Sequence, residues 1–187
     1  MTQAIQVLGI AGSLREDSYN LALLRAAQEL AGESMSIQIT ELDDIPSFNE
    51  DVEAAGDPEA VQELKRQIGE ADALLIATPE YQHGIPGVLK NALDWASRPP
   101  GESQLHGKPA AIMGATPGDF GTARAQEQLR QALIYNNCPM VKVPEVLVAN
   151  AEDKVDEAGE FTDRETLDFV AQLLEALEDL VSTHADD

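Results

Sequence analysis

IQVLGIAGSLREDSYN, residues 5–20, is the stretch that decides the fold. Its first half is almost wholly apolar, which predicts a buried β-strand. Its second half is polar, and an amphipathic run from Leu21 to Leu30 follows it. Parallel α/β sheets bind phosphate where a strand, a short turn and a helix start succeed one another, because backbone N–H groups and the positive end of the helix dipole face the ligand there.

The side chains of this turn add donors that suit a phosphate. Ser13, Ser18 and Asn20 can donate hydrogen bonds. The Arg15 guanidinium can form a charged fork with phosphate oxygens. The alternative is that the polar residues only form the turn and cap the helix, while Arg15 pairs with one of the two carboxylates after it. The clustering of a guanidinium with three donors favours a monophosphate site.

Bulk properties exclude several classes of partner. The chain has 187 residues, 43% of them hydrophobic, which suffices for a single folded domain over residues 1–187. Its formal net charge of −22 argues against nucleic acids and anionic membranes as partners, because both attract basic patches. Either ordinary surface solvation or adaptation to a salt-rich cytoplasm explains the acidity, and the sequence leaves both open.

Signals for targeting and for metal are absent from the sequence. No basic stretch precedes a long apolar region, and no apolar run approaches the roughly 20 residues that cross a bilayer. We therefore expect a cytoplasmic protein without membrane insertion. Cys138 is the sole cysteine and the three histidines lack ligand spacing, so we expect no disulfide and no metal site. Cys138 is interpreted as a passive small residue.

Apolar and amphipathic runs alternate along the whole chain. Ala73–Ala77 and Pro109–Met113 are continuously apolar, which is typical of strands buried on both faces of a parallel sheet. Right-handed crossovers between such strands give a doubly wound α/β sheet. The expected strands are residues 4–10, 35–41, 72–78, 109–115 and 143–149, and the expected helices are residues 19–32, 58–70, 86–97, 121–136 and 163–183.

Local signals locate two of the helix starts. Asp57 followed by Pro58 predicts an N-cap and a proline at the first helical position. Thr162 and Glu165 have the spacing of a capping box. Irregular surface loops are expected over residues 43–56 and 149–159.

Ligands of doubly wound sheets bind beyond the carboxyl ends of the strands, where residues 12–20, 78–87 and 115–122 form three loops. Prolines stiffen the second loop, and its glycines let the backbone approach a flat ligand. Tyr81 can pack against a ring, and Gly118 helps to bend the third loop into a wall. A phosphate site beside a flat slot predicts a mononucleotide, in particular FMN.

The loops resemble those of the NADPH-dependent FMN reductases, and within them the chromate and quinone reductase branch. The resemblance runs from residue 5 to about residue 150. It implies a flavodoxin-like three-layer α/β sandwich, a five-stranded parallel sheet in the order 2-1-3-4-5, and tightly bound FMN. It rests on Gly12–Arg15 with Ser18 and Asn20, on Thr78–Tyr81, on Gly84–Gly87 and on Leu89–Trp95.

The resemblance also implies roles for single residues. Phosphate contacts would come from Ser13, Arg15, Ser18 and Asn20, with Tyr19 among them. The isoalloxazine would lie against Pro79, Glu80, Tyr81, Gln82, His83 and Gly84, with Thr116 and Gly118 on its other side. Relatives often have Asn in place of Gln82, and often have more glycines in the third loop, where this chain has Pro117, Asp119 and Phe120. The acceptor pocket is therefore the part of the site that the resemblance leaves open.

No catalytic side chain is expected, because FMN itself carries the chemistry. NADPH or NADH would deliver a hydride in ping-pong order, followed by a quinone, free flavin, an azo compound or a metal oxyanion such as chromate. His83 is either a minor proton donor or a residue of the pocket rim. Glu80 is interpreted as a structural residue that bonds loop backbone.

Other functions and the oligomeric state stay open. A flavodoxin-like electron carrier and a non-catalytic flavin redox sensor would bind the same cofactor. Trp95 has helical spacing with Leu89 and Ala92, which predicts an apolar contact surface of the kind that often forms a dimer interface in this family. Arg124 and Glu145 either pair across subunits or stay solvated. We expect a homodimer or a homotetramer.

Overall fold

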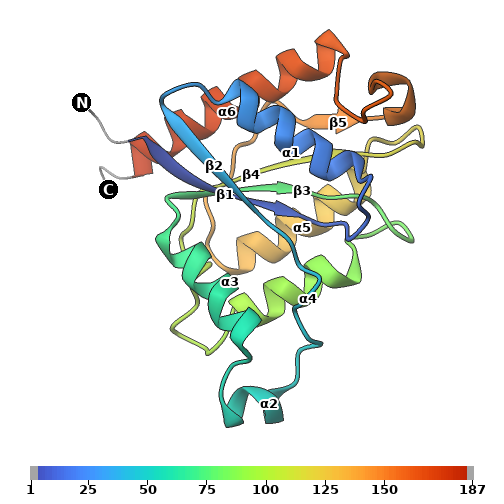
Figure 1. The fold of residues 1–187 in the computed structure, drawn as a ribbon. Coiled ribbons are helices and arrows are strands. Elements are labelled where there is room, and N and C mark those ends of the chain that lie inside the picture. Colours follow the sequence, from blue (N-terminus) through green and yellow to red (C-terminus); the bar gives the residue numbers. More distant parts are fainter. Residues whose placement is uncertain (1–3, 185–187) are drawn as a thin grey trace.

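Five parallel strands form the central sheet, in the order β2-β1-β3-β4-β5. The computed structural model describes residues 4–184 (Figure 1). Ile5 of β1 lies opposite Met35 of β2, and Val7 lies opposite Ala73 of β3. This order is the one that the resemblance implies. The strands are β1 (Ile5–Ala11), β2 (Met35–Thr40), β3 (Ala73–Ala77), β4 (Ala110–Ala115) and β5 (Val146–Val148).

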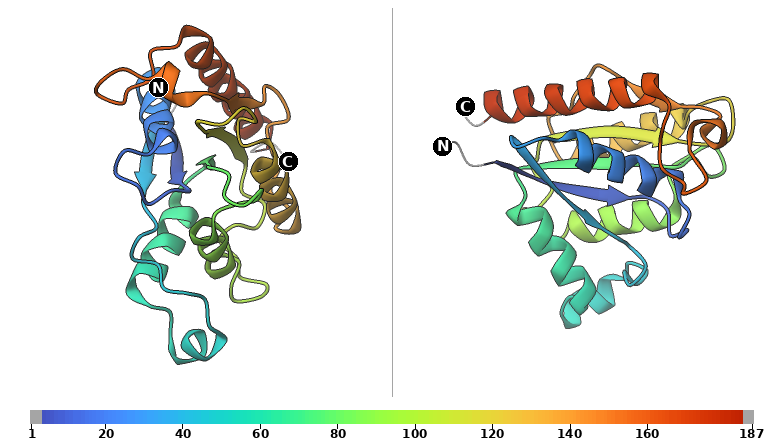
Figure 2. Two further views of the ribbon diagram at one scale, coloured as in Figure 1. Left: turned by 90° about the vertical axis from the view of Figure 1, so that its right-hand side faces the viewer. Right: turned by 45° about the horizontal axis from the view of Figure 1, so that its top comes forward.

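Helices cover both faces of the sheet and complete the expected three layers (Figures 1 and 2). On one face lie α1 (Tyr19–Leu30) and α6 (Arg164–His184). On the other lie α3 (Glu59–Glu70), α4 (Gly87–Ala96) and α5 (Ala123–Tyr135). The predicted flavodoxin-like α/β class is thereby confirmed.

Two apolar clusters hold the layers together. Every residue of β3 and of β4 is buried, as expected for strands covered on both sides. Leu24 of α1 and Leu177 of α6 share one cluster, whereas Leu89 of α4 and Leu129 of α5 share the other. Each fully buried leucine side chain contributes roughly 1.5–3 kcal/mol relative to exposure, so these clusters are the main source of stability.

The structure corrects the expected elements at three places. β5 spans only Val146–Val148, shorter than the expected 143–149. The expected loop 43–56 contains α2 (Glu50–Ala55), and the expected loop 149–159 contains the 3₁₀ helix η1 (Ala151–Lys154). α2 has no buried residue, so it carries no apolar periodicity for a sequence pattern to detect.

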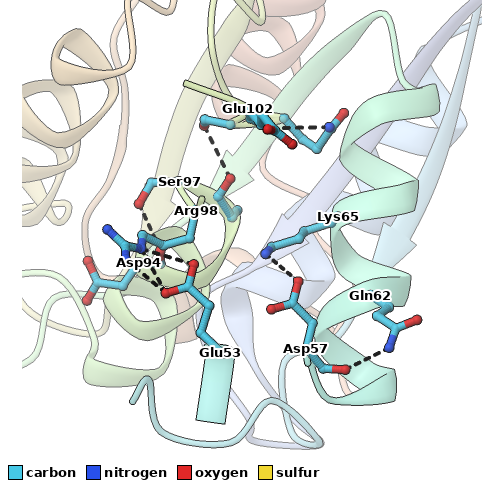
Figure 3. A network of polar contacts seen from close by, with 11 residues as sticks. Glu53, Asp57, Gln62, Lys65, Asp94, Ser97, Arg98 and Glu102 are labelled. Carbon is cyan, nitrogen blue, oxygen red and sulfur yellow. Dashed lines mark hydrogen bonds and ion pairs between the residues drawn. The ribbon is translucent and has the colours of Figure 1, made fainter. Parts of the chain in front are cut away.

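The segment that carries α2 is bound to α4 and to Arg98, which lies just after α4 (Figure 3). The Arg98 guanidinium lies 2.9 Å from the Glu53 carboxylate and 3.3 Å from that of Glu50. The amide of Asn91 donates to the carbonyl of Pro46 at 2.8 Å. Residues 43–57 therefore form an arm, held by an ion-pair cluster at its far end and by hydrogen bonds at its base.

Trp95 lies beneath this arm and does not form the predicted contact surface. Its side chain is 0% exposed. Its indole N–H donates to the carbonyl of Pro46 at 2.8 Å, and its ring meets that of Phe48 edge to face at 4.9 Å. The prediction was wrong because the helical spacing identifies an apolar face but not what covers it.

Both predicted helix caps differ in detail. Pro58 itself is the N-cap of α3 and makes no side-chain cap, while the Asp57 carboxylate bonds Lys65 at 2.5 Å. At the start of α6, Asp163 replaces Thr162 as the capping side chain and accepts from the backbone N–H of Thr166 at 2.9 Å. Hydrogen bonds from Thr166 lower the pKa of Asp163. Within residues 4–184, no helix combines the length and the apolar character that crossing a bilayer requires.

Candidate functional site

The loops that follow β1, β3 and β4 lie at one end of the sheet, because these strands are parallel neighbours (Figure 1). Side chains connect the three loops. The Ser13 hydroxyl of the first loop lies 3.3 Å from the Tyr81 hydroxyl of the second. Glu80 of the second loop bonds Arg124, whose guanidinium lies 4.3 Å from the ring centre of Phe120 in the third. The predicted convergence of the loops is therefore present in the structure.

The first loop ends in a capped helix start. Ser18 is the N-cap of α1, is 4% exposed, and accepts hydrogen bonds from the N–H groups of Asn20 and Leu21 at 3.3 and 3.4 Å. The Ser13 hydroxyl accepts from the N–H of Arg15 at 3.4 Å. Both serines thus shape the loop through hydrogen bonds to its backbone N–H groups.

Arg15 is exposed and forms no ion pair with another residue of the described range 4–184. The alternative of a surface pair with the next two carboxylates is therefore not what the structure has. The guanidinium lies 5.9 Å from the ring centre of Tyr19. A cavity of about 320 Å³ opens beside it, between Arg15–Tyr19 and Val155–Gly159. The wall formed by Val155–Gly159 was not predicted, because the sequence indicated only an irregular surface loop there.

Asn20 differs from the other first-loop residues, because its side chain is engaged inside the protein. It is 3% exposed. Its amide donates to the carbonyl of Ala115 at 2.9 Å, and its oxygen accepts from the N–H of Ala115 at 2.9 Å. Asn20 therefore ties the start of α1 to the end of β4, where the third loop begins.

The second loop folds into a tight turn of four residues. The N–H of Tyr81 donates to the carbonyl of Gly84, and the N–H of Gly84 donates to the carbonyl of Tyr81, both at 3.0 Å. The central residues Gln82 and His83 have φ angles of 50° and 63°. Two left-handed central residues define a type I′ turn, which normally selects Asn or Gly. This conformation explains why Asn is a natural residue in place of Gln82.

Gln82→Asn is therefore expected to stabilise the protein. Asn tolerates the left-handed region better than Gln, so the free energy of unfolding should rise by about 0.5–1 kcal/mol and the melting temperature by about 1–4 °C. Thermal unfolding followed by circular dichroism measures the change. The matched control is Gln131→Asn. Gln131 is an exposed residue of α5 with right-handed helical backbone, so this change should lower the stability slightly. Equal signs for the two variants would contradict this explanation.

Glu80 is a buried carboxylate that caps a helix from a different loop. Its side chain is 8% exposed. The N–H groups of Arg124 and Ala125 donate to it at 3.0 and 3.3 Å, and the Arg124 guanidinium donates at 2.7 Å. Thr122, the N-cap of α5, supplies no side-chain cap of its own. The interpretation of Glu80 as a structural residue agrees with these contacts, but the backbone that it bonds is that of α5 and not, as expected, that of its own loop.

Arg124 and Glu145 do not pair with each other in the chain. Arg124 binds Glu80, and the Glu145 carboxylate lies 3.5 Å from the Arg130 guanidinium. Each of the two residues thus has an ion-pair partner within its own chain, and their pairing across subunits stays a prediction.

The third loop is tied to the last residue of β5 and to the segment after it. The N–H of Thr116 donates to the carbonyl of Val148 at 3.0 Å, and the N–H of Asn150 donates to the carbonyl of Gly118 at 3.2 Å. The space around Gly118 is open, since a Cβ there would come no nearer than 3.8 Å to the Thr116 hydroxyl. Phe120 projects from the loop and is 64% exposed. This loop can therefore form a backbone wall with one aromatic side chain at its rim.

Neither the cysteine nor the loop histidine shows signs of chemical activation. Cys138 is buried, and burial raises the pKa of its thiol to about 11, so little nucleophilic thiolate exists at neutral pH. His83 is exposed at the tip of the turn. Within the described part of the chain, no three His, Cys, Asp or Glu residues are grouped to hold a metal ion.

One residue that sequence reasoning missed is Gln128 of α5. Its amide oxygen accepts from the N–H of Ile85, and its amide nitrogen donates to the carbonyl of His83, both at 3.3 Å. No sequence pattern identifies this role, because Gln128 is one of several polar residues on a surface helix and its partner loop lies more than 40 positions earlier.

Known proteins are similar to this chain in sequence and in architecture. The family model of the NADPH-dependent FMN reductases matches residues 5–153. An NAD(P)H-dependent FMN reductase of Pseudomonas aeruginosa is 49% identical over 95% of this chain and 96% of its own, and a 2-hydroxy-1,4-benzoquinone reductase of a Burkholderia species is 38% identical over 92% and 93%. The flavoenzyme FerB, an NAD(P)H:(acceptor) oxidoreductase of Paracoccus denitrificans, superimposes with a TM-score of 0.87 at 37% identity over 97% of this chain and 99% of its own. The chain belongs to the NADPH-dependent FMN reductase family.

Proposed function

We propose that the protein is an FMN-containing oxidoreductase that takes electrons from NAD(P)H and reduces quinones. The observation that carries this proposal is the junction of three loops at one sheet edge, with the capped start of α1 and an ion-pair-free Arg15 beside it. Relatives named as FMN and quinone reductases over nearly their whole length support it.

The first loop fits a phosphate by the chemistry of its donors. Ser13 and Ser18 supply hydroxyls, α1 directs its positive dipole end toward the loop, and Arg15 supplies a guanidinium that has no ion pair among residues 4–184. We assign the phosphate of FMN to these residues, with Tyr19 at the edge of the site. For Asn20 we propose a bracing role instead, because its amide already bonds the backbone of Ala115.

The second and third loops would hold the isoalloxazine between them. Pro79–Gly84 form one wall, and Thr116 with Gly118 form the other. Bonds from α5 to Glu80 keep the second loop in place before the cofactor arrives, which reduces the ordering cost of binding. His83 would lie at the rim of this slot.

When bound, FMN supplies hydride acceptance from NAD(P)H and hydride donation to the acceptor, which we propose to occur in ping-pong order. The chain's own contribution is to bind, to orient and to leave one side of the slot open. The exposed rings of Tyr81 and Phe120 suit flat acceptors such as quinones, free flavin and azo compounds. Reduction of chromate, a homodimeric or homotetrameric assembly and a cytoplasmic location remain predictions.

A visible spectrum of the purified protein, followed by anaerobic addition of NADPH and then NADH, tests the proposal. Bound flavin that is bleached by the nucleotide alone and recolours with a quinone supports an oxidoreductase. A flavin that neither nucleotide bleaches would instead indicate an electron carrier, and a flavin that bleaches but does not turn over would indicate a redox sensor. Protein that does not bind FMN even at saturating concentration would refute the proposal altogether.

Arg15→Ala is expected to raise the Kd for FMN by about 10- to 100-fold, because a charge-assisted hydrogen bond contributes roughly 1.5–3 kcal/mol. Fluorescence quenching of FMN on titration with apoprotein measures this change. Lys142→Ala removes one charge from another exposed side chain, which has no ion pair within the described range 4–184, and should leave the Kd nearly unchanged. If both variants weakened binding equally, Arg15 would act only through the overall charge.

A further inference from the structure

Gln128 of α5 binds the second loop through two hydrogen bonds. Its amide bonds both the carbonyl of His83 and the N–H of Ile85. The fit is close, since a Cβ on Gly84 would come within 2.5 Å of the Gln128 amide oxygen. An amide side chain that accepts from one residue and donates to another acts here like a neighbouring strand.

With the bonds from Gln128, the backbone N–H groups at the tip of the turn are the ones left without a partner in the described part of the chain. Tyr81 and Gly84 bond each other, and Gln128 bonds the carbonyl of His83. The N–H groups of Gln82 and His83 have no acceptor among residues 4–184. Two adjacent backbone donors are thus left available at the tip of a loop that borders the proposed flavin slot.

α5 holds the turn at two points one helical turn apart. Arg124 and Gln128 occupy positions i and i+4, so both side chains lie on the same face of the helix. Arg124 secures Glu80 before the turn, and Gln128 secures His83 and Ile85 within and after it. The turn needs this support, because a non-glycine residue in the left-handed region costs of order 1–3 kcal/mol and persists there only when its surroundings hold it.

We propose that Gln128 is a positioning residue of the flavin site: by fixing the turn, it aims the tip N–H groups of Gln82 and His83 at the ring and so favours the reduced, more negative form of the cofactor. This inference rests on the proposed function. Its physical basis is that preorganised backbone donors stabilise developing negative charge without reorganising. The donors keep their effect only while the turn keeps its shape.

The experiment measures the Kd of oxidised FMN and, anaerobically after dithionite, of reduced FMN. In Gln128→Met, which keeps the length of the side chain but loses both hydrogen bonds, the ratio of the reduced to the oxidised Kd should rise about 10-fold. For a two-electron couple this ratio corresponds to a potential about 30 mV lower. Gln128→Ala should behave in the same way, and Gln131→Met on the same helix should match the wild type.

A double variant separates positioning from simple loss of packing. Adding Gln82→Asn to Gln128→Met should restore much of the ratio, because Asn holds the left-handed conformation without the bonds from Gln128. An unchanged ratio in Gln128→Met, with FMN still bound, would overturn this inference and leave the proposed function intact. Failure of the wild type to bind FMN would overturn both.

Discussion

Gly114→Ala is expected to remove about 3 kcal/mol from the free energy of unfolding, the upper end of the usual cost of overpacking and a large part of the 5–15 kcal/mol typical of a domain. Gly114 lies inside β4. A Cβ there would fall inside the contact radius of the Thr122 hydroxyl and lie 2.5 Å from the carbonyl oxygen of Thr78. Because Thr78 O is a backbone atom of the adjacent loop, the clash cannot be relieved by a side-chain rotation. Urea denaturation followed by circular dichroism measures the loss.

Gly87→Ala is the matched control for this substitution. Gly87 is the first residue of α4, and a Cβ there would meet no atom within 4 Å. Alanine in a helix favours folding by up to about 1 kcal/mol over glycine, so this variant should be as stable as the wild type or more so. Adding Thr122→Ala to Gly114→Ala should recover only part of the loss, since the contact with Thr78 remains. A Gly114→Ala protein as stable as the control would show that β4 and the loop after β3 can separate at little cost.

Asn20→Ala is expected to cost about 2–5 kcal/mol of stability and to weaken FMN binding as well. The substitution deprives the buried N–H and C=O of Ala115 of their partner. Each buried backbone group left without a hydrogen bond costs about 1–3 kcal/mol. FMN binding should suffer because the bridge between the first and third loops is lost. Denaturation midpoints and FMN titrations of the same preparations measure the two effects.

Gln28→Ala, on the same helix, provides the comparison. Gln28 donates a single, partly buried hydrogen bond to the carbonyl of Ile37 at 2.8 Å, so its loss should cost about 1 kcal/mol or less. It should leave the Kd for FMN unchanged, because β2 lies at the far edge of the sheet from the third loop. Equal losses of stability and of FMN affinity in the two variants would mean that the hydrogen bonds from Asn20 to Ala115 contribute no more than an ordinary surface hydrogen bond.

The strands could be predicted because their signal is local. A run such as Ala73–Ala77 is apolar throughout, and only burial on both faces explains it. α2 escaped prediction because it buries nothing. Trp95 was misplaced for a different reason: its apolar character was evident, but the segment from Pro46 to Phe48 that covers it is more than 40 positions away.

In the candidate site, too, some features could be predicted from the sequence and others could not. That three loops converge follows from a parallel sheet and needs no knowledge of side chains. The bonds that fix these loops, from Asn20 to Ala115, from Glu80 to Arg124 and from Gln128 to Ile85, join residues 43 to 95 positions apart. Polar residues on a surface helix or in a turn have many available partners, and only the folded chain selects one. The left-handed turn at Gln82 was not evident from the sequence, because Gln is not one of the residues that favour positive φ angles.

The arm formed by residues 43–57 has a practical consequence for protein engineering. Beyond its anchor at Glu53, the chain from Ala54 to Gly56 is exposed, and a Cβ on Gly56 would meet no atom within 4 Å. A peptide tag or a fluorescent reporter spliced in at this point would disturb neither apolar cluster. The arm is therefore a suitable insertion site for immobilising the molecule on a surface or for fusing it to another protein.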